Sequence, residues 1–542
     1  MGALTLKSFP FELRGWDIEK LESIDPTDGF GSDTRVYVSK NQIVQIEPDF
    51  NINSSGTWLT DKGRQFFDGI FGTWNPNKKN NLNELEWTNN NWSDIVKNIV
   101  QTLYMFEHCR TQQNKSNFFI IAFENLSIEL LSLLTMISQN QPFVKLRRVE
   151  KLKADNDLET NFQLNLVSNK LKLNSSTLCL LISNNPRYEG YHLNLNLRQR
   201  FLKGNFKCLM VGSLIDLTFP TSFLGSNLNV LKTIVEGNNL ICQELKYSKN
   251  PMVVVNNDLL KRNDSQESLK MLKILKYARI FSGSWNGLNM LNSSLSDVGT
   301  QSLNRFVPLN EKDLNNFSSL YFLNVADNNA PNLKRIAELK LFNCSDLSIN
   351  IKPLFLDQNS KINNNIDTYN ILNNKINTNF ERYLYLPSSM FYENEETFLS
   401  TDGFIKRTNK IIFKKKTKNN WQILRRVFKH LHKNLQFIDN KNNNLISFNS
   451  TKINNFKTYI NFHYQATQTL TNINFYLSIK NESFILFDST SNFKKERIKL
   501  KNTKLKYWLD DFFNGSKDEY SQHSLVLASC AKILRSKSTN FF

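Results

Sequence analysis

Short apolar runs recur along the middle of the chain, and helical patterns lie between several of them. The runs are Phe118–Phe123, Leu178–Ile182, Cys208–Val211, Met252–Val255 and Leu320–Val325. A strand that is apolar at every position is buried on both faces. Alternation of such strands with helical patterns, as at Leu126–Ile137, is typical of a mostly parallel sheet covered by helices on both sides. The sequence therefore predicts an α/β fold.

The length and composition set the scale of this fold. The chain has 542 residues, too many for one ordinary domain. Hydrophobic residues make up 40% and charged residues 22%, close to ordinary soluble usage. The apolar runs are far shorter than the ~20 residues that a membrane-spanning helix needs. We therefore expect no direct membrane span.

The chain carries a formal net charge of +19, which has two interpretations. It could serve a nucleic-acid or anionic partner. It could also follow from codon bias, because Asn, Lys, Ile and Phe have A/T-rich codons and abound here, as expected of an organelle genome. We favour codon bias and expect no nucleic-acid partner, because the lysines are scattered and not interleaved with stacking aromatics.

Clustered metal ligands are absent from the sequence. The six cysteines are Cys109, Cys179, Cys208, Cys242, Cys344 and Cys530, and no two lie within four residues of each other. The closest histidines, His430 and His432, do not have a helical metal-ligand spacing. No Ser-His-Asp or Cys-His set has supporting context. We expect no metal site and no catalytic residue in this chain.

The two ends of the chain differ from its middle. Arg35–Glu47 alternates around Lys40-Asn41, which predicts a hairpin in a small N-terminal β region, and Ser521–Leu534 predicts a final helix. Lys406–Lys433 is strongly basic, and a solvated face and an acidic protein partner explain it equally well. The expected division is residues 1–75 (linker and β region), 76–345 (α/β domain), 346–382 (Asn-rich insertion or loop), 383–455 (return to the α/β domain and the basic stretch) and 456–542 (C-terminal region).

Three groups of segments resemble a known family in order and spacing. The first group is Arg14–Asp25, Trp58–Arg64 and Asp68-Gly69; the second is Ile182–Glu189, Val211–Ser213, Asp216–Thr218 and Lys249–Val254; the third is Leu386-Pro387, Glu393, Thr397 and Asp402-Gly403. They look like the large iron–sulfur subunits of respiratory complex I, whose C-terminal part is molybdopterin-oxidoreductase-like. The resemblance covers residues 1 to about 330, resumes near Leu386 and returns weakly at Asp518–Lys532.

This resemblance implies mostly parallel sheets flanked by helices, and a place in the matrix-facing arm of NADH:ubiquinone oxidoreductase in mitochondria. In that family, a run similar to Gly2–Thr5 directly follows the last cysteine of the iron–sulfur region. We therefore expect a split subunit, encoded in the organelle, whose cluster-bearing N-terminal half is a separate chain. The iron–sulfur clusters would belong to that half, and FMN to a flavoprotein partner.

The loops that hold the pterin cofactor in working molybdopterin oxidoreductases are degenerate here. Asn185-Pro186 matches one such loop. The stretch that includes Asp216 lacks the Arg of the usual Asp-Pro-Arg. The stretch from Glu393 to Gly403 has Glu396 in place of a Gly, and Phe404 follows it in place of an Arg. A carboxylate and a ring where phosphate would bind argue against a polyanionic cofactor.

The resemblance thus implies a scaffold subunit of an NADH:ubiquinone oxidoreductase, without a cofactor of its own. The alternatives are an active molybdopterin-dependent oxidoreductase and a basic nucleic-acid-binding protein. Trp16 is the interface candidate, because Arg14–Asp25 follows the point where the cluster-bearing half ends in the family. We expect Trp16 to be buried against that half or against the first sheet.

Overall fold

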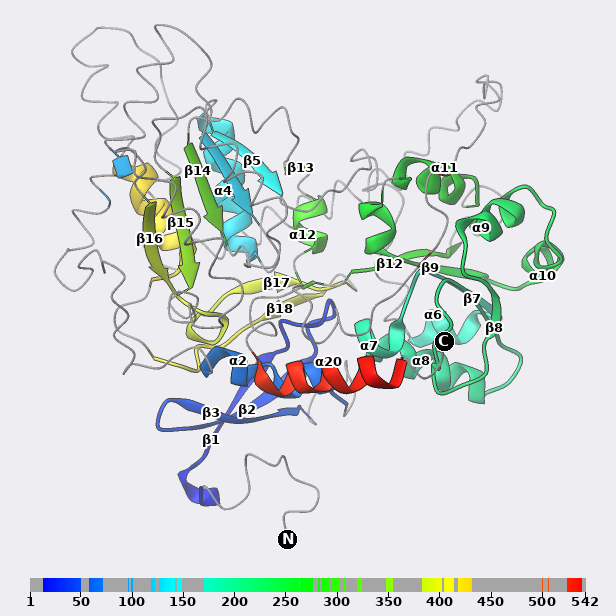
Figure 1. Ribbon diagram of the computed structural model, residues 1–542, viewed down its shortest axis with the longest axis horizontal. Coiled ribbons are helices and arrows are strands. Elements are labelled where there is room, and N and C mark those ends of the chain that lie inside the picture. The colour runs from blue at the N-terminus through cyan, green and yellow to red at the C-terminus, as the bar shows by residue number, and fades with distance from the viewer. Residues whose placement is uncertain are drawn as a thin grey trace, which may run out of the picture.

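The computed structural model contains a small N-terminal sheet and two larger α/β units (Figure 1). It describes residues 13–49, 58–71, 96, 99–100, 118–122, 126–141, 144–148, 170–262, 264–275, 281–282, 285–292, 294–295, 297–302, 306–308, 319–323, 348–353, 383–401, 404–413, 418–430, 500, 505 and 524–538. The two units stand side by side, and the N-terminal sheet lies below the junction between them.

The N-terminal sheet is antiparallel in the order β1-β2-β3, and it follows a short 3-10 helix, η1 (Gly15–Asp17). Its strands are β1 (Glu19–Ile24), β2 (Asp33–Ser39) and β3 (Gln42–Pro48). The predicted hairpin is confirmed: Lys40 and Asn41 form its turn at φ 47° and 66°, a conformation that asparagine tolerates better than most residues.

Three helices complete the core of this N-terminal region. They are α1 (Asp61–Gln65), α2 (Phe67–Phe71) and α20 (Leu525–Ser538). The Thr60 hydroxyl caps α1 by accepting the N–H of Gly63. Phe66 and Leu527, from opposite ends of the chain, share one apolar cluster with Ile46. The final helix thus exists, but it begins at Leu525 because Ser524 caps it, four residues later than predicted.

A five-stranded parallel sheet lies at the right of Figure 1, in the order β12-β9-β6-β7-β8. Its strands are β6 (Leu178–Ile182), β7 (Lys207–Val211), β8 (Ser222–Gly225), β9 (Met252–Asn256) and β12 (Leu288–Leu291). The helical segments around it are α6 (Lys170–Ser175), α7 (Pro186–Glu189), α8 (Tyr191–Leu202), α9 (Leu228–Val235), α10 (Ile241–Tyr247), η3 (Asn257–Lys261) and α11 (Ser265–Leu275).

Alternate residues of these strands enter two different cores. Leu178 and Leu180 pack on the side of α9 and α11, whereas Cys179 and Leu181 pack on the side of α8. Both faces of the central strand β6 are therefore buried, which is why it is apolar at every position, whereas the edge strand β8 has no buried residue. The expected fold class, with parallel sheets flanked by helices and a small N-terminal sheet, is confirmed.

A six-stranded parallel sheet forms the other unit, in the order β13-β5-β4-β14-β15-β16. Its strands are β4 (Phe118–Ala122), β5 (Val144–Arg148), β13 (Val307–Pro308), β14 (Ser319–Leu323), β15 (Ser348–Pro353) and β16 (Tyr383–Ser388). Helix α4 (Ile128–Asn140) and the helical residues 420–430 pack against it through one core.

Strand β15 corrects the interpretation of residues 346–382 as a loop throughout. Ser348–Pro353 pairs with β14 on one side and β16 on the other, and backbone pairing satisfies its polar groups despite its mixed side chains. Residues 354–382 lie outside the described part of the chain, as does most of the helix expected after Ser93.

An antiparallel hairpin crosses the junction of the two units (Figure 1). It consists of β17 (Thr397–Leu399) and β18 (Ile405–Arg407), preceded by the 3-10 helix η7 (Phe391–Glu393). Helix α12 (Asp297–Ser302) contacts β17, and the short strands β10 (Phe281–Ser282) and β11 (Trp285–Asn286) pair with each other just before β12 in the chain. None of the described helices is long and apolar enough to cross a membrane.

Candidate functional site at the junction of the two units

The predicted pterin loop lies at the carboxyl end of β6. Ser183 takes a left-handed conformation (φ 54°) and turns the chain, and Pro186 then begins α7. The Asn185 carbonyl accepts the N–H groups of Tyr188 and Glu189. The side-chain amides of Asn184 and Asn185 are buried, and neither makes a hydrogen bond among the described residues. Buried amides without partners are uncommon and mark a position that a polar group could occupy.

Further asparagines follow the two strands next to β6. Asn256 ends β9 and donates to Glu189 Oε2 at 2.6 Å, and Asn257 donates to Asp297 Oδ2 at 3.2 Å. Among the described residues, the buried amide of Asn292, which follows β12, has no hydrogen-bond partner. Parallel strands place their carboxyl ends at one edge, which is where ligands bind in open α/β sheets. We call Asn184, Asn185, Asn256, Asn257 and Asn292 the amide cluster.

The loop between β1 and β2 covers this edge. The Asp25 carboxylate accepts from Thr27, and the Asp28 carboxylate accepts from the N–H of Phe30 and the hydroxyl of Ser32. These bonds fix the loop. The Phe30 ring, only 4% exposed, packs in the same core as residues of β6, α8 and β12.

Gly29 explains how the loop approaches so closely. A Cβ atom at this position would lie 2.1 Å from the carbonyl oxygen of Asn292, so no larger residue fits without movement. The Gly29 carbonyl accepts both the N–H and the hydroxyl of Thr401, each at 2.8 Å. The loop is thereby held between the end of β12 and the end of β17.

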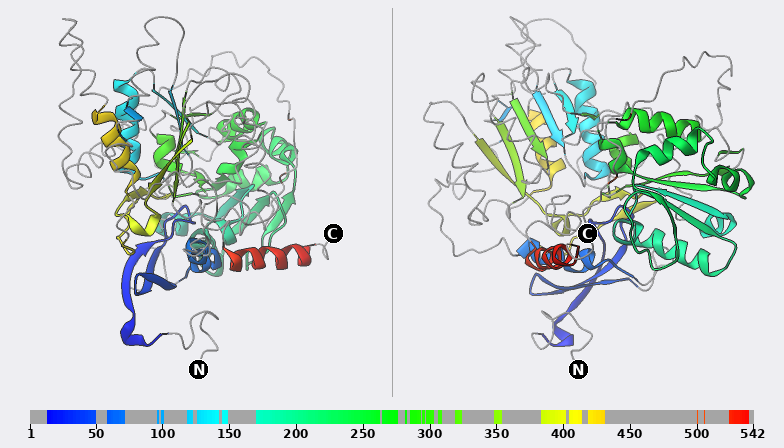
Figure 2. Two further views of the ribbon diagram at one scale, coloured as in Figure 1. Left: turned by 60° about the vertical axis from the view of Figure 1, so that its left-hand side comes forward. Right: turned by 45° about the vertical axis from the view of Figure 1, so that its right-hand side comes forward.

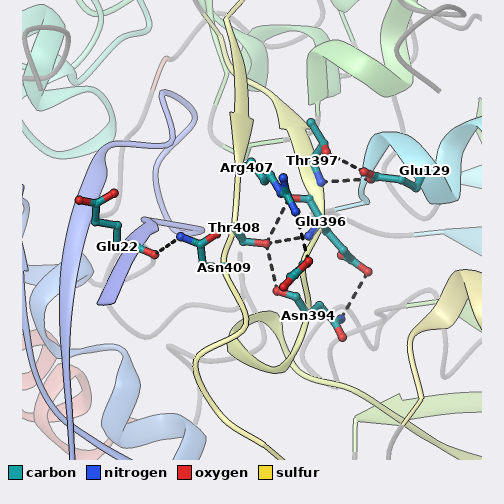
Figure 3. A network of polar contacts seen from close by, with 9 residues as sticks. Glu22, Glu129, Asn394, Glu396, Thr397, Arg407, Thr408 and Asn409 are labelled. Atoms are coloured by element: carbon teal, nitrogen blue, oxygen red, sulfur yellow. Dashed lines mark hydrogen bonds and ion pairs between the residues drawn. The ribbon is translucent and has the colours of Figure 1, made fainter. Parts of the chain in front are cut away.

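Two buried glutamates meet at the β17–β18 hairpin (Figure 3). Glu129, at the start of α4, accepts the hydroxyl of Thr397 at 2.6 Å and its N–H at 3.1 Å. Glu396 is the neighbouring residue. Burial first, and then the charge of Glu129, raise the pKa of Glu396 to about 8. Glu396 is therefore mostly protonated at neutral pH.

Side chains of β18 and the residues after it fix the rest of this network (Figure 3). The Thr408 hydroxyl accepts the N–H of Glu396 at 2.9 Å and lies 3.2 Å from the Asn394 carbonyl. Asn409 donates to the Glu22 carbonyl of β1, and Lys406 binds both carboxylate oxygens of Asp33. The hairpin thus joins α4 to the N-terminal sheet.

Of the other predicted site residues, Asp216 lies beside the amide cluster through its contact with Arg187, whereas Glu393 is bound within η7. The Asp216 side chain is 79% exposed and forms an ion pair with Arg187 at 3.0 Å. A hydrogen bond from the N–H of Thr218, aided by Arg187, lowers the pKa of Asp216. Glu393 is buried and accepts the N–H of Met390, so it caps η7. Gly403 lies outside the described residues.

Trp16 does not pack on the first sheet. Its side chain is 82% exposed in η1, which precedes β1. The expectation that Trp16 is buried against the first sheet is therefore wrong. Burial against a partner chain stays a prediction.

Sequence reasoning missed Glu129, Phe30 and three members of the amide cluster. A repeated signal existed, because Asn follows or ends each of the three adjacent apolar strands β6, β9 and β12. No sequence signal marks Glu129, because its partner Thr397 lies 268 residues further along the chain.

The residues at this junction do not fit a polyanionic pterin dinucleotide. The two arginines tied to the amide cluster are already bound by carboxylates: Arg148 by Asp297 at 2.9 Å and Arg187 by Asp216. The buried side chains nearby are mainly neutral amides and the carboxyls of Glu189 and Asp297, with His192 packed on the Phe30 ring, and they offer phosphate little positive charge. Among the described residues, no group of three or more His, Cys, Asp or Glu side chains could hold a metal ion.

Comparison with known proteins identifies the family. The 75 kDa subunit of NADH-ubiquinone oxidoreductase from Reclinomonas americana is 31% identical over 318 residues, 56% of this chain and 45% of that protein. The mitochondrial NADH dehydrogenase [ubiquinone] iron-sulfur protein 1 of Solanum tuberosum is 25% identical over 346 residues, 61% of this chain and 44% of its own length. The mitochondrial 78 kDa subunit of NADH-ubiquinone oxidoreductase from Neurospora crassa is 27% identical over 322 residues, 57% of this chain and 41% of its own length.

The chain therefore spans less than half the length of these relatives. Among solved structures, a chain of the formyltransferase/hydrolase complex of Methylorubrum extorquens aligns with 62% of this chain and 96% of its own at 10% identity, with a TM-score of 0.39 that carries no argument. Residues 76–430, more than half of the chain, match the molybdopterin oxidoreductase family. The chain belongs to the molybdopterin oxidoreductase family.

Proposed function

We propose that this chain is a subunit of NADH:ubiquinone oxidoreductase, respiratory complex I, and serves as a scaffold in its peripheral arm. The similarity over 318 residues to the 75 kDa subunit carries this proposal. Two of the relatives are named as mitochondrial, which supports the mitochondrion as the location. The matrix side of the inner membrane is part of the proposal, because the peripheral arm lies there in the family that the sequence resembles.

The scaffold role rests on the shape and chemistry of the junction. The two sheets have buried cores, and the hydrogen-bonded hairpin lies at their junction, which supports a rigid arrangement. Rigidity matters in electron transfer because tunnelling depends on fixed distances between centres. The buried carboxyls and paired arginines support the absence of a bound pterin. The chain's own contribution would be to hold neighbouring subunits in place.

The proposed partners are a separate chain that carries the iron–sulfur clusters, together with the flavoprotein and other subunits of the peripheral arm. The clusters and FMN would then reside in those chains. The name of the Solanum relative contains the word "iron-sulfur", which supports the presence of iron–sulfur clusters in the proposed assembly.

Copurification tests the proposal. The tagged full chain, isolated from its own organism under mild detergent, should bring down a flavoprotein and cluster-bearing subunits with NADH-oxidising activity. Isolation of the chain with none of these would contradict the complex I assignment. Recovery with bound pterin would favour an active molybdopterin-dependent enzyme. Recovery with DNA or RNA, lost as salt rises, would favour the nucleic-acid alternative.

A further inference from the structure

The helical residues 420–430, which we call the basic helix, lie beside α4 on one face of the six-stranded sheet (gold in Figure 2, left). The apolar side of this helix is buried in the core that α4 also enters. Its buried residues are Trp421, Ile423, Leu424, Val427 and Phe428. This packing fixes the orientation of the helix, so its other side faces outward in a defined position.

That other side gathers positive charge. Arg425 and Lys429 are half-buried and stand one turn apart, and Arg426 between them is exposed. Within the described part of the chain, neither arginine forms an ion pair with a carboxylate. Like charges at i and i+4 destabilise a helix, so this arrangement is unfavourable in the chain by itself.

Two further observations describe the surroundings of these charges within the described residues. Burial, and then the charge of Arg426, lower the pKa of Arg425; the same two causes, in the same order, lower the pKa of Lys418. The Nε atom of Arg425 is fully buried and has no hydrogen-bond partner among the described residues. A half-buried guanidinium with an unsatisfied donor and a cationic neighbour is poised to accept an anionic partner.

We propose that Arg425, Arg426 and Lys429 form the docking site for an acidic segment of another subunit of the complex. The inference rests on the proposed function, because it requires a multi-subunit assembly. Carboxylate side chains match the planar donor pattern of guanidinium groups and would satisfy the Arg425 donor that has no partner among the described residues. Docking of such a segment would remove the repulsion between the arginines.

Nucleic acid fits this face less well. Proteins that hold single strands combine basic residues with exposed aromatic rings on which bases stack. On the basic helix the two aromatic residues, Trp421 and Phe428, are buried in the core and offer no ring to a base. The exposed side of the basic helix therefore offers positive charges without a Trp or Phe ring, and such a surface suits carboxylates better than nucleic-acid bases.

The test measures two properties of one variant: the unfolding temperature of the isolated chain and its affinity for the rest of the complex. Arg425→Gln/Arg426→Gln removes the repulsion, so the isolated full chain should unfold at the same temperature as the wild type or higher. The same variant should lose roughly tenfold or more of its affinity for the rest of the complex, as expected when one side of a charge pair is truncated. The loss for Arg425→Glu/Arg426→Glu should be larger, and added salt should narrow the gap between wild type and variants.

A matched control changes charge elsewhere. Arg198 on α8 and Lys532 on α20 are exposed, and Arg198→Gln/Lys532→Gln should assemble like the wild type. Normal assembly of the Arg425/Arg426 variants would overturn the inference, as would a loss of stability in the isolated chain that accounts for weaker assembly. Stabilisation of the wild-type chain by inorganic phosphate to the same extent as by the rest of the complex would also overturn the inference. So would Arg425/Arg426 variants that lose RNA binding but still assemble normally. If the wild type copurifies with no complex I subunit, the proposed function fails first.

Discussion

Thr397 donates both its hydroxyl and its backbone N–H to the carboxylate of Glu129, at 2.6 and 3.1 Å, across 268 residues of sequence. The bond ties the β17–β18 hairpin to the start of α4, and so to the six-stranded sheet. Because both residues are buried, water cannot replace either partner.

Thr397→Val should therefore destabilise the chain. The change keeps the shape of the side chain but removes the hydroxyl from a buried carboxylate, at a cost of about 1–3 kcal/mol. Urea unfolding of the full chain measures it. Thr135→Val is the control, because the Thr135 hydroxyl donates only to a carbonyl of its own helix. If both changes lower the free energy of unfolding equally, the contact between Thr397 and Glu129 contributes no more than the hydrogen bond within the helix.

Glu396 should make stability depend on pH. The folded protein keeps a proton up to about pH 8, whereas the unfolded chain releases it near the ordinary value of 4.5. The folded state thus binds more protons between these values, and its stability from this group falls as pH rises through the window. Glu396→Gln should gain stability relative to wild type as pH rises from 5 to 9. Glu395→Gln, whose carboxylate is exposed, should show no such trend.

Trp16→Ala should leave the isolated chain unchanged but weaken assembly. A side chain that is 82% exposed contributes little to folding, so its unfolding midpoint should not move. If Trp16 anchors the cluster-bearing partner, truncation should cost about 2–4 kcal/mol of association. Native electrophoresis would show loss of the NADH-oxidising end while the membrane arm persists. A complex in which Trp16 faces solvent would refute the anchor.

Phe30→Ala should loosen the cover over the carboxyl end of β12. Its ring is buried between strands and helix α8, so removal should cost about 3–5 kcal/mol. Phe404→Ala, at an exposed position, is the control and should be nearly neutral. Thermal unfolding measures the stability of both variants. Equal unfolding midpoints would mean that the Phe30 ring does not anchor the loop.

Metal analysis tests the absence of a cofactor. The chain separated from its partners should contain neither molybdenum nor stoichiometric iron, because its arginines near the amide cluster are bound by carboxylates. One equivalent of either metal would contradict the scaffold proposal. The same assay on the whole complex should find iron, which serves as the internal control.

Sequence patterns predicted the local elements better than their assembly. The continuous apolar run Leu178–Ile182 predicted β6 to the residue, because a strand buried on both faces leaves an unmistakable pattern. Nothing in the runs showed that β4 and β14 join one sheet and β6 another, since that choice depends on long-range packing.

The candidate site was predictable only in part for the same reason. Asn185 and Pro186 lie at a strand end as expected, because the turn chemistry is local. Glu393 caps a 3-10 helix instead, and Glu129 was invisible because only the fold brings it to Thr397. The exposed position of Trp16 shows that a large apolar side chain alone does not reveal which surface it will meet.

The core under the N-terminal sheet sets an order of events during synthesis. It combines Ile24 and Val36 with Tyr392 and Leu527, so it cannot close until the ribosome has released the chain beyond Leu527. The five-stranded sheet needs only residues 178–291 for its strands and can form while synthesis continues. Until α20 emerges, the apolar face of β2 and β3 remains uncovered by that helix. A nascent chain stalled before residue 525 should therefore stay bound to chaperones for longer than a chain that includes α20.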